Sequence, residues 1–374
     1  MDSLVANKEM FFGPHAVALL NHSNFATIMK VIRFGWMKFL VPCICLFLFS
    51  ASCKRKDHRP DVSGIKLSIP VERFDLDLFS IDTLNISNGL LTLAQTHPGF
   101  YRDFMSEILG VNGDPKDSTT LKATRFFLTS YAAIADSLRI KYKNINWLQQ
   151  KLESDFRYVK YYFPDYKINR AILFVGPFDA PGVATTTHGI AIGLQQFAGK
   201  DFSIYQTDQA QELFPLYISR RFSPEYISAN CVKAVAQDLF PDKSAGKPLI
   251  EQMVEKGKQW WLLDQLLPAT PDSIKTGYTA AQLDWCKANE GLIWSYLLKN
   301  EDLNSINPTI VQTYIGEGPF TQGFSQDDSP GNIGQWIGWQ ILKKYVLKNP
   351  SSDITTVMNM DARKIIEEAK YKPR

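Results

Sequence analysis

Residues 329–341 read SPGNIGQWIGWQI, a loop that leads into a helix rich in tryptophan and glycine. The helix is expected to run on to Lys348 and to end before Pro350, since proline cannot continue it. Gly334 and Gly338 stand one turn apart, and each costs about 0.8–1 kcal/mol in a helix interior. That cost indicates either a second backbone packed closely against this face or a helix that lines a cleft.

Three carboxylates precede this block, namely Glu317, Asp327 and Asp328. The adjacent pair Asp327 and Asp328 could share a proton and do acid–base chemistry. In the alternative interpretation, which we favour, this pair caps a helix whose first residue is Pro330, where acidic side chains are stabilising.

Away from this block, the hydrophobic period changes from helical to strand-like and back. Helical spacing is expected over residues 121–138, 145–159, 227–239, 249–263 and 283–297. The runs 171–175 and 189–194 are typical of buried strands, with a Gly/Pro/Thr loop over 179–187 between them. The order predicts a helix-dominant α+β fold with a small β-sheet flanked by helices. We expect Phe174, Leu194 and Ile337 in its core.

The N-terminal region has the pattern of an export signal. Basic residues precede an apolar run over 39–49, which is too short to span a bilayer as a helix. Small residues and then Cys53 follow, as in a bacterial lipoprotein signal in which the cysteine becomes lipidated. A plain cleaved signal peptide and an uncleaved anchor are the alternatives.

This pattern starts late in the chain. We therefore interpret residues 1–52 as a leader and signal peptide, with the true start at Met29 or Met37. Residues 53–63 are polar and basic and are expected to form a tether. Residues 64–374 are expected to form a single globular domain.

Composition excludes some classes of function. The chain of 374 residues carries a formal charge of +3, and part of that excess lies in the leader, so the domain has no basic footprint for nucleic acid. A hydrophobic content of 45% predicts a packed core rather than disorder. Beyond the tether only Cys231 and Cys286 remain, and we expect two buried thiols, with a disulfide as the alternative.

Motifs for catalysis are missing from the sequence. After the signal the histidines are His58, His97 and His188, none within five residues of another, so there is no H-E-x-x-H and no zinc spacing. No G-x-S-x-G elbow and no phosphate loop occur. The sequence predicts no metal, no cofactor and no enzyme.

Several motifs together resemble the gliding-motility lipoprotein GldB family. These are the lipoprotein signal, Arg220-Arg221-Phe222, Pro268 after an aromatic-rich helix, Pro319-Phe320-Thr321 and the tryptophan-rich block. The resemblance implies an envelope lipoprotein that is needed for gliding and linked to the secretion system that exports adhesins. Its expected partners are the membrane, through its lipid anchor, and other gliding or secretion proteins of the envelope. No acidic run follows Cys53, which by resemblance implies a periplasm-facing domain.

The resemblance also implies a distant kinship to zinc peptidases of the gluzincin type. Strand 189–197 and helix 225–239 would then correspond to the edge strand and the metal helix of such an enzyme. The helix contains no histidine, and Asp238 alone cannot replace two imidazoles. A site of this ancestry would have lost its metal and would survive as a binding surface.

The candidate cleft or binding residues are Arg220, Arg221, Asp238, Glu317, Asp327, Asp328, Trp336 and Trp339. Three hypotheses for the function remain open. The first, which we favour, is a non-enzymatic gliding lipoprotein that acts through protein contacts. The alternatives are a periplasmic hydrolase that uses the carboxylates or a degenerate peptidase site, and a ligand-binding lipoprotein in which Trp336 and Trp339 line a pocket.

Overall fold

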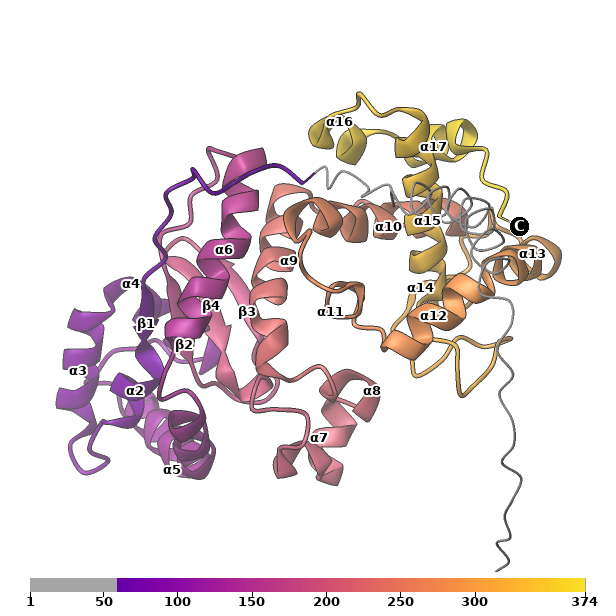
Figure 1. Cartoon of the computed structure of the whole chain (residues 1–374). Helices are drawn as coiled ribbons and strands as arrows, with labels where there is room; N and C mark the ends of the chain where they lie inside the picture. Colours follow the sequence, from indigo (N-terminus) through magenta and orange to yellow (C-terminus); the bar gives the residue numbers. More distant parts are fainter. Residues whose placement is uncertain (1–58, 374) are drawn as a thin grey trace, which may run out of the picture. The chain divides into compact units, whose positions relative to one another are not determined.

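A four-stranded sheet lies in the N-terminal half of residues 59–373, the part of the chain that this computed structural model describes (Figure 1). Its strands are β1 (Val71–Arg73), β2 (Ala171–Phe174), β3 (Val183–Thr186) and β4 (Gly189–Gly193), in the order β1-β2-β4-β3. The first three in that order are parallel, and β3 runs antiparallel to β4.

Two of these strands confirm the sequence prediction, and the other two were missed. β2 and β4 are the predicted apolar runs, whereas β3 lies inside the predicted loop over 179–187. The expectation of an edge strand at 189–197 is wrong, because β4 is hydrogen-bonded on both sides and β3 forms the edge.

Side chains alternate across the sheet, so each face contributes to a different hydrophobic cluster. Ile172 and Phe174 pack beneath α2 (Phe74–Phe79), α3 (Ile86–Thr96), α4 (Pro98–Asp103), the π-helical turn η1 (Phe104–Ile108) and the first half of α5 (Ser118–Lys141). Ala171 and Leu173 pack beneath α6 (Asn146–Tyr162) and α9 (Ile227–Leu239). The sheet is therefore covered by helices on both faces.

The other regular elements of the described chain are helices. These are η2 (Leu194–Gln196), η3 (Ser203–Gln206), α7 (Asp208–Leu213), α8 (Leu216–Ser219), η4 (Pro224–Tyr226), α10 (Leu249–Leu266), α11 (Asp272–Thr276), α12 (Ala280–Ala288), α13 (Glu290–Asn300), α14 (Pro308–Ile315), α15 (Ile333–Lys348), α16 (Ile354–Asn359) and α17 (Ala362–Ala369). The predicted helix-dominant α+β fold is confirmed. The single helix expected over 283–297 is wrong, because the chain breaks at Asn289, which ends α12 and precedes α13 with non-helical dihedrals.

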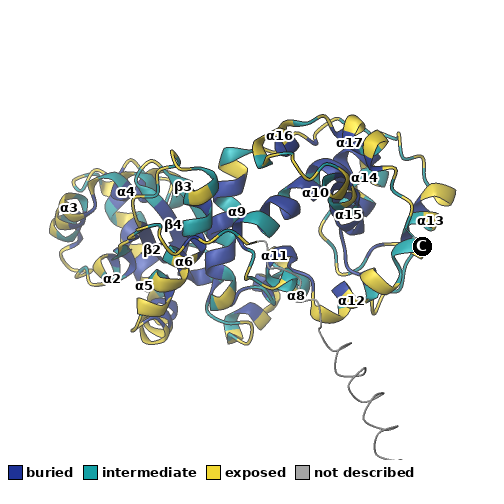
Figure 2. Ribbon diagram, turned by 45° about the horizontal axis from the view of Figure 1, so that its top comes forward, coloured by how far each residue is buried: buried dark blue, intermediate teal, exposed yellow. Residues whose placement is uncertain are grey.

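The helix predicted from the quoted block is α15, and it packs along α10 (Figure 2). A Cβ on Gly338 would overlap the carbonyl group of Met253, and a Cβ on Gly257 would overlap the backbone of Gly338. The backbones of α10 and α15 therefore approach closely at these glycines, which confirms the interpretation that a second backbone packs against this face of the helix. Phe174, Leu194 and Ile337 are buried as predicted.

The start of α15 differs from the prediction. The helix begins at Ile333 rather than Pro330, and its N-cap is Asn332 in the left-handed region with φ 43°. The amide of Asn332 donates to the carbonyl oxygen of Gly316 at 3.0 Å, which holds the preceding residues in a loop. Asp327 and Asp328 therefore do not cap this helix, and Asp328 accepts a hydrogen bond from Ser325 instead.

Cys231 and Cys286 are free, buried thiols, as the sequence predicts. Burial raises the pKa of both thiols, that of Cys286 to about 12. Because the thiolate is the reactive form, we expect neither residue to be alkylated by iodoacetamide in the folded protein at neutral pH. Peptide mass spectrometry should find both modified only after unfolding in urea. Rapid labelling of either one under native conditions would contradict this packing.

The predictions for the leader, the signal peptide, the start at Met29 or Met37 and the lipidation of Cys53 lie outside the described residues, and the tether is described only from Arg59. Within residues 59–373, no helix is both long enough and apolar enough to cross a bilayer.

Candidate functional site

Two of the sequence-predicted residues, Arg221 and Glu317, come together although they are 96 positions apart. Arg221 follows α8, and Glu317 lies in the loop after α14. The guanidinium nitrogens Nη1 and Nη2 lie 3.3 and 3.2 Å from the two carboxylate oxygens, a two-pronged arrangement. This pair joins the loop that precedes α15 to the segment that precedes α9.

The guanidinium of Arg220, the preceding residue, is hydrogen-bonded to backbone carbonyl and side-chain amide oxygens. Its guanidinium donates to the carbonyl oxygens of Tyr217 and Gly277 and to the amide oxygen of Gln282, at 2.9–3.2 Å. Burial, followed by the charge of Arg221, lowers the pKa of Arg220. Arginine remains charged even so, and within the described residues no carboxylate lies within 4.0 Å of this guanidinium. The position therefore adds a positive charge without an ion pair, which Glu317 offsets from a longer distance.

Next to these arginines lies a cavity of about 250 Å³, which we call the basic pocket. Its wall is formed by α9, α10, the start of α15 and the residues around Arg221 and Glu317. Its charged lining residues are Arg221, Lys233, Lys256, Asp242 and Glu317. Amide side chains and an apolar patch complete the wall.

Lys233 differs from the other two cations of the basic pocket. Lys256 pairs with Asp242 at 2.6 Å and Arg221 pairs with Glu317, whereas Lys233 has no carboxylate within 4.0 Å among residues 59–373. Its Nζ has one long contact, 3.5 Å to the carbonyl oxygen of Ile274. Burial, followed by the charge of Arg221, lowers the pKa of Lys233 to about 8, while Glu317 acts in the opposite direction.

The pKa of Lys233 gives a direct prediction. After reductive methylation with ¹³C-formaldehyde, the Lys233 resonance should titrate near pH 8, against about 10.4 for an ordinary lysine. The resonance is assigned by its loss in Lys233→Met. Replacing Glu317 with glutamine removes the opposing charge and should move the midpoint lower still. A midpoint near the ordinary value would show that the Lys233 ammonium is fully solvated.

The same shift has a consequence for stability. The pKa of Lys233 is lower in the folded state than in the unfolded state, so the folded state binds fewer protons between pH 8 and about 10.4. The contribution of Lys233 to the free energy of unfolding therefore rises with pH across that window. Below pH 8 the contribution is unfavourable. Wild type should therefore gain stability relative to Lys233→Met between about pH 7 and about pH 9.5, and a constant difference in urea denaturation would contradict this.

The start of α15 forms another part of the pocket wall, through Asn332 and Gln335. The hydroxyl of Tyr278 lies 2.8 Å from the side-chain oxygen of Asn332 and 2.9 Å from the carbonyl oxygen of Gly331. Asn332 is thus turned toward Tyr278 and does not cap the helix with its own side chain, and the amide of Ile333 donates to the hydroxyl of Thr321 at 3.4 Å. The positive end of the dipole of this sixteen-residue helix therefore lies at the pocket.

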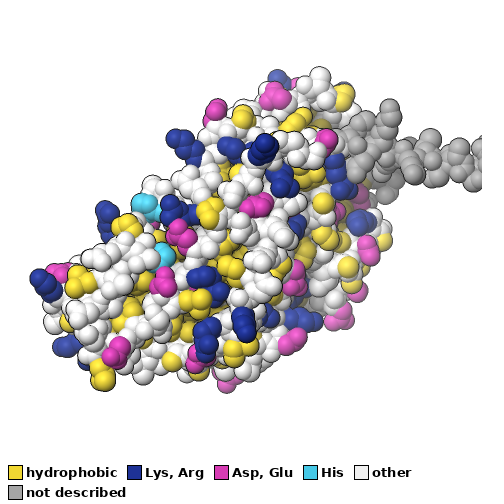
Figure 3. Space-filling view, turned by 60° about the vertical axis from the view of Figure 1, so that its left-hand side comes forward, with side chains coloured by type: hydrophobic (Ala, Val, Ile, Leu, Met, Phe, Trp, Pro, Cys, Tyr) yellow, Lys and Arg dark blue, Asp and Glu magenta, His cyan; other side chains and the backbone are white. Residues whose placement is uncertain are grey.

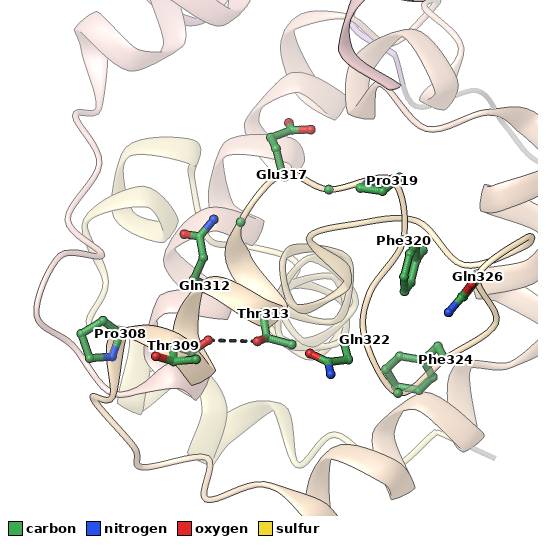
Figure 4. Close-up of a pocket in the computed structure, with 13 residues that line it drawn as sticks. Pro308, Thr309, Gln312, Thr313, Glu317, Pro319, Phe320, Gln322, Phe324 and Gln326 are labelled. Carbon is green, nitrogen blue, oxygen red and sulfur yellow. Dashed lines mark hydrogen bonds between the residues drawn. The ribbon is translucent and has the colours of Figure 1, made fainter. Parts of the chain in front are cut away.

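A second cavity, of about 870 Å³, lies between α14 and the loop over residues 316–326, and we call it the loop pocket. Figure 4 shows Thr309, Thr313 and Gln312 on the helix and Phe320, Phe324 and Gln326 on the loop. Glu317 lines both the loop pocket and the basic pocket. Asp327 and Asp328 are exposed and line neither, so the three candidate carboxylates do not share one cavity.

The remaining predicted residues lie elsewhere. Asp238 accepts a hydrogen bond from the hydroxyl of Tyr166 at 2.8 Å, in a separate cavity of about 470 Å³ beside β3 and β4. Trp336 and Trp339 are 1% and 2% exposed and belong to the core. The indole of Trp339 donates to Asp264 at 2.8 Å. The two tryptophans thus pack in the core near the contact of α10 and α15, and they line neither the basic pocket nor the loop pocket.

Sequence reasoning missed Lys233, Lys256 and Gln335. One indication was available: Lys233 stands in α9 between Val232 and Val235, which are both buried. A lysine there is usually read as a long side chain that reaches solvent. Only the structure shows that this ammonium has no carboxylate partner.

Metal ligands do not gather in the described part of the chain, where no group of three or more His, Cys, Asp or Glu residues is placed to hold an ion. On the face shown in Figure 3, acidic and basic side chains are interspersed.

These features define a helix-dominant α+β protein with a cation-rich pocket where α9, α10 and α15 meet. The chain matches the family model described as gliding motility protein GldB over residues 55–373, and it therefore belongs to this family. Searches of the curated proteins and of the solved structures find no match. Family membership makes this a protein related to gliding motility and a lipoprotein of the envelope.

Proposed function

We propose that this protein supports gliding from a lipid anchor in the cell envelope, through contacts with other envelope proteins and without catalysing a reaction. We further propose that it acts together with the secretion system that exports the adhesins. The observation that carries the proposal is the family match, which covers the whole globular region from residue 55 to residue 373.

The anchor is proposed at Cys53, which follows the apolar run and the small residues of the export signal. Several acyl chains on one cysteine would give stable attachment, at about 0.8 kcal/mol per buried CH₂. The residues after Cys53 are basic rather than acidic, which supports a periplasm-facing domain. Replacing Cys53 with alanine should move the protein from the membrane fraction to the soluble periplasmic fraction. A variant that stays in the membrane would contradict anchoring by lipid.

The non-catalytic part rests on the arrangement of the candidate carboxylates. Glu317 is paired with Arg221, while Asp328 accepts from a serine on an exposed loop. A carboxylate pair that works as acid and base would instead share one site with its substrate. The helix that would hold a peptidase metal has no histidine.

Two measurements test the proposal. Depletion of the protein in its host should reduce the amount of adhesin in the medium, and normal export would remove the link to secretion. The purified protein should hydrolyse no peptide substrate and retain no stoichiometric zinc. Turnover that Glu317→Gln abolishes would instead support a carboxylate-dependent hydrolase.

A further inference from the structure

We propose that the basic pocket binds a small organic oxyanion, a carboxylate or phosphate group carried on a short apolar body. The inference concerns binding in this cavity and does not depend on the role in gliding.

Within the described part of the chain, one of the three cations that line the pocket is not paired with a carboxylate. Arg221 is balanced by Glu317 and Lys256 by Asp242, but Lys233 has no carboxylate within 4.0 Å among the described residues and only a 3.5 Å contact to the carbonyl oxygen of Ile274. Arg220, the neighbour of Arg221 in the chain, adds a second cation without an ion pair, although Glu317 acts on it from a longer distance. A partly buried ammonium group without a paired carboxylate is costly, and a bound anion would lower that cost.

The start of α15 favours the same ligand. The N-terminal end of a helix attracts negative charge, and here its cap residue is turned away to Tyr278. Two elements that line the cavity therefore favour an anion: α9 contributes the ammonium of Lys233, and α15 contributes the positive end of its dipole.

The rest of the wall limits the size and character of the ligand. Ala236, Trp260 and Leu263 supply the apolar part of the cavity lining. A water molecule occupies about 30 Å³ in the liquid, so a cavity of about 250 Å³ holds an oxyanion together with several carbon atoms. Glu317 and Asp242 already neutralise two of the three lining cations, which disfavours a polyanion such as nucleic acid.

The test compares a matched pair of probes on the full-length protein purified in detergent. Butyrate and butyramide have nearly the same shape, and only butyrate is charged, while inorganic phosphate reports the oxyanion alone. Ligand-observed NMR should show binding of butyrate or phosphate at millimolar concentration, with butyramide about tenfold weaker or undetectable. The more strongly bound anion identifies the preferred oxyanion.

Lys233→Met keeps the apolar stem and removes the charge, so it should fold and should bind the anion about tenfold more weakly. Lys344→Met, on an exposed position of α15, is the matched control and should bind as wild type does. Thermal unfolding checks that both variants are folded. The proposal is overturned if neither anion binds, if butyramide binds as well as butyrate, or if Lys233→Met binds as tightly as wild type. Each outcome stands whether or not the protein is needed for gliding.

Discussion

Replacing Gly338 with alanine is expected to lower the free energy of unfolding by about 2 kcal/mol. The new methyl group would overlap the carbonyl group of Met253 on α10, and a backbone cannot move aside as a flexible side chain can. Overpacking of this kind typically costs about 1–3 kcal/mol and occasionally more. The higher helix propensity of alanine returns only about 1 kcal/mol.

Urea denaturation of Gly338→Ala and Gly334→Ala side by side measures this effect. The steric overlap at Gly334 is smaller than that at Gly338. A Cβ on Gly334 would lie 2.8 Å from the carbonyl oxygen of Tyr314 and 3.0 Å from the Met253 side chain, which can move. Gly338→Ala should therefore lose more stability than Gly334→Ala. If both variants are as stable as wild type, α10 and α15 do not approach as closely as described.

Removing the carboxylate of Glu255 is expected to cost about 3–5 kcal/mol, the usual effect of breaking a buried ion pair. Lys258, which is 2% exposed, has its Nζ 3.0 Å from Glu255 and 2.6 Å from the carbonyl oxygen of Met360. Glu255 also pairs with Lys247 at 2.7 Å. In Glu255→Ala the Lys258 ammonium would remain buried without its counter-charge.

A double variant separates the lost pair from the stranded charge. Glu255→Leu combined with Lys258→Met removes both charges and should recover much of the stability lost in Glu255→Ala. Asp284→Ala breaks an exposed pair with Lys287 and should change stability by less than about 1 kcal/mol. Equal losses in the double and single variants would mean that packing, and not charge, dominates at this site.

Much of the fold follows from local patterns. The apolar runs of β2 and β4 and the helical periods of α5, α6, α9, α10 and α15 are visible in the sequence. β1 and β3 have only three and four residues and are half-buried, so their sequences carry little strand pattern; β1 forms by pairing with the distant β2, and β3 by a hairpin with β4. The break at Asn289 was hidden because apolar residues continue at helical spacing on both sides of it.

The candidate site was less predictable. Arg221 and Glu317 were both singled out, but their meeting depends on the path of the chain over 96 positions. Lys233 was not chosen, since its lack of an ion pair is a property of the folded surroundings rather than of its neighbours in α9. Trp336 and Trp339 belong to the core because the glycines of α15 bring α10 close to the same helix.

We propose that gliding requires this chain. The most direct measurement is to deplete the protein in its own host, film cells on glass, and restore wild type from a plasmid. Gliding should stop on depletion and return with wild type but not with Cys53→Ala. Cells that glide at normal speed after complete depletion would contradict it.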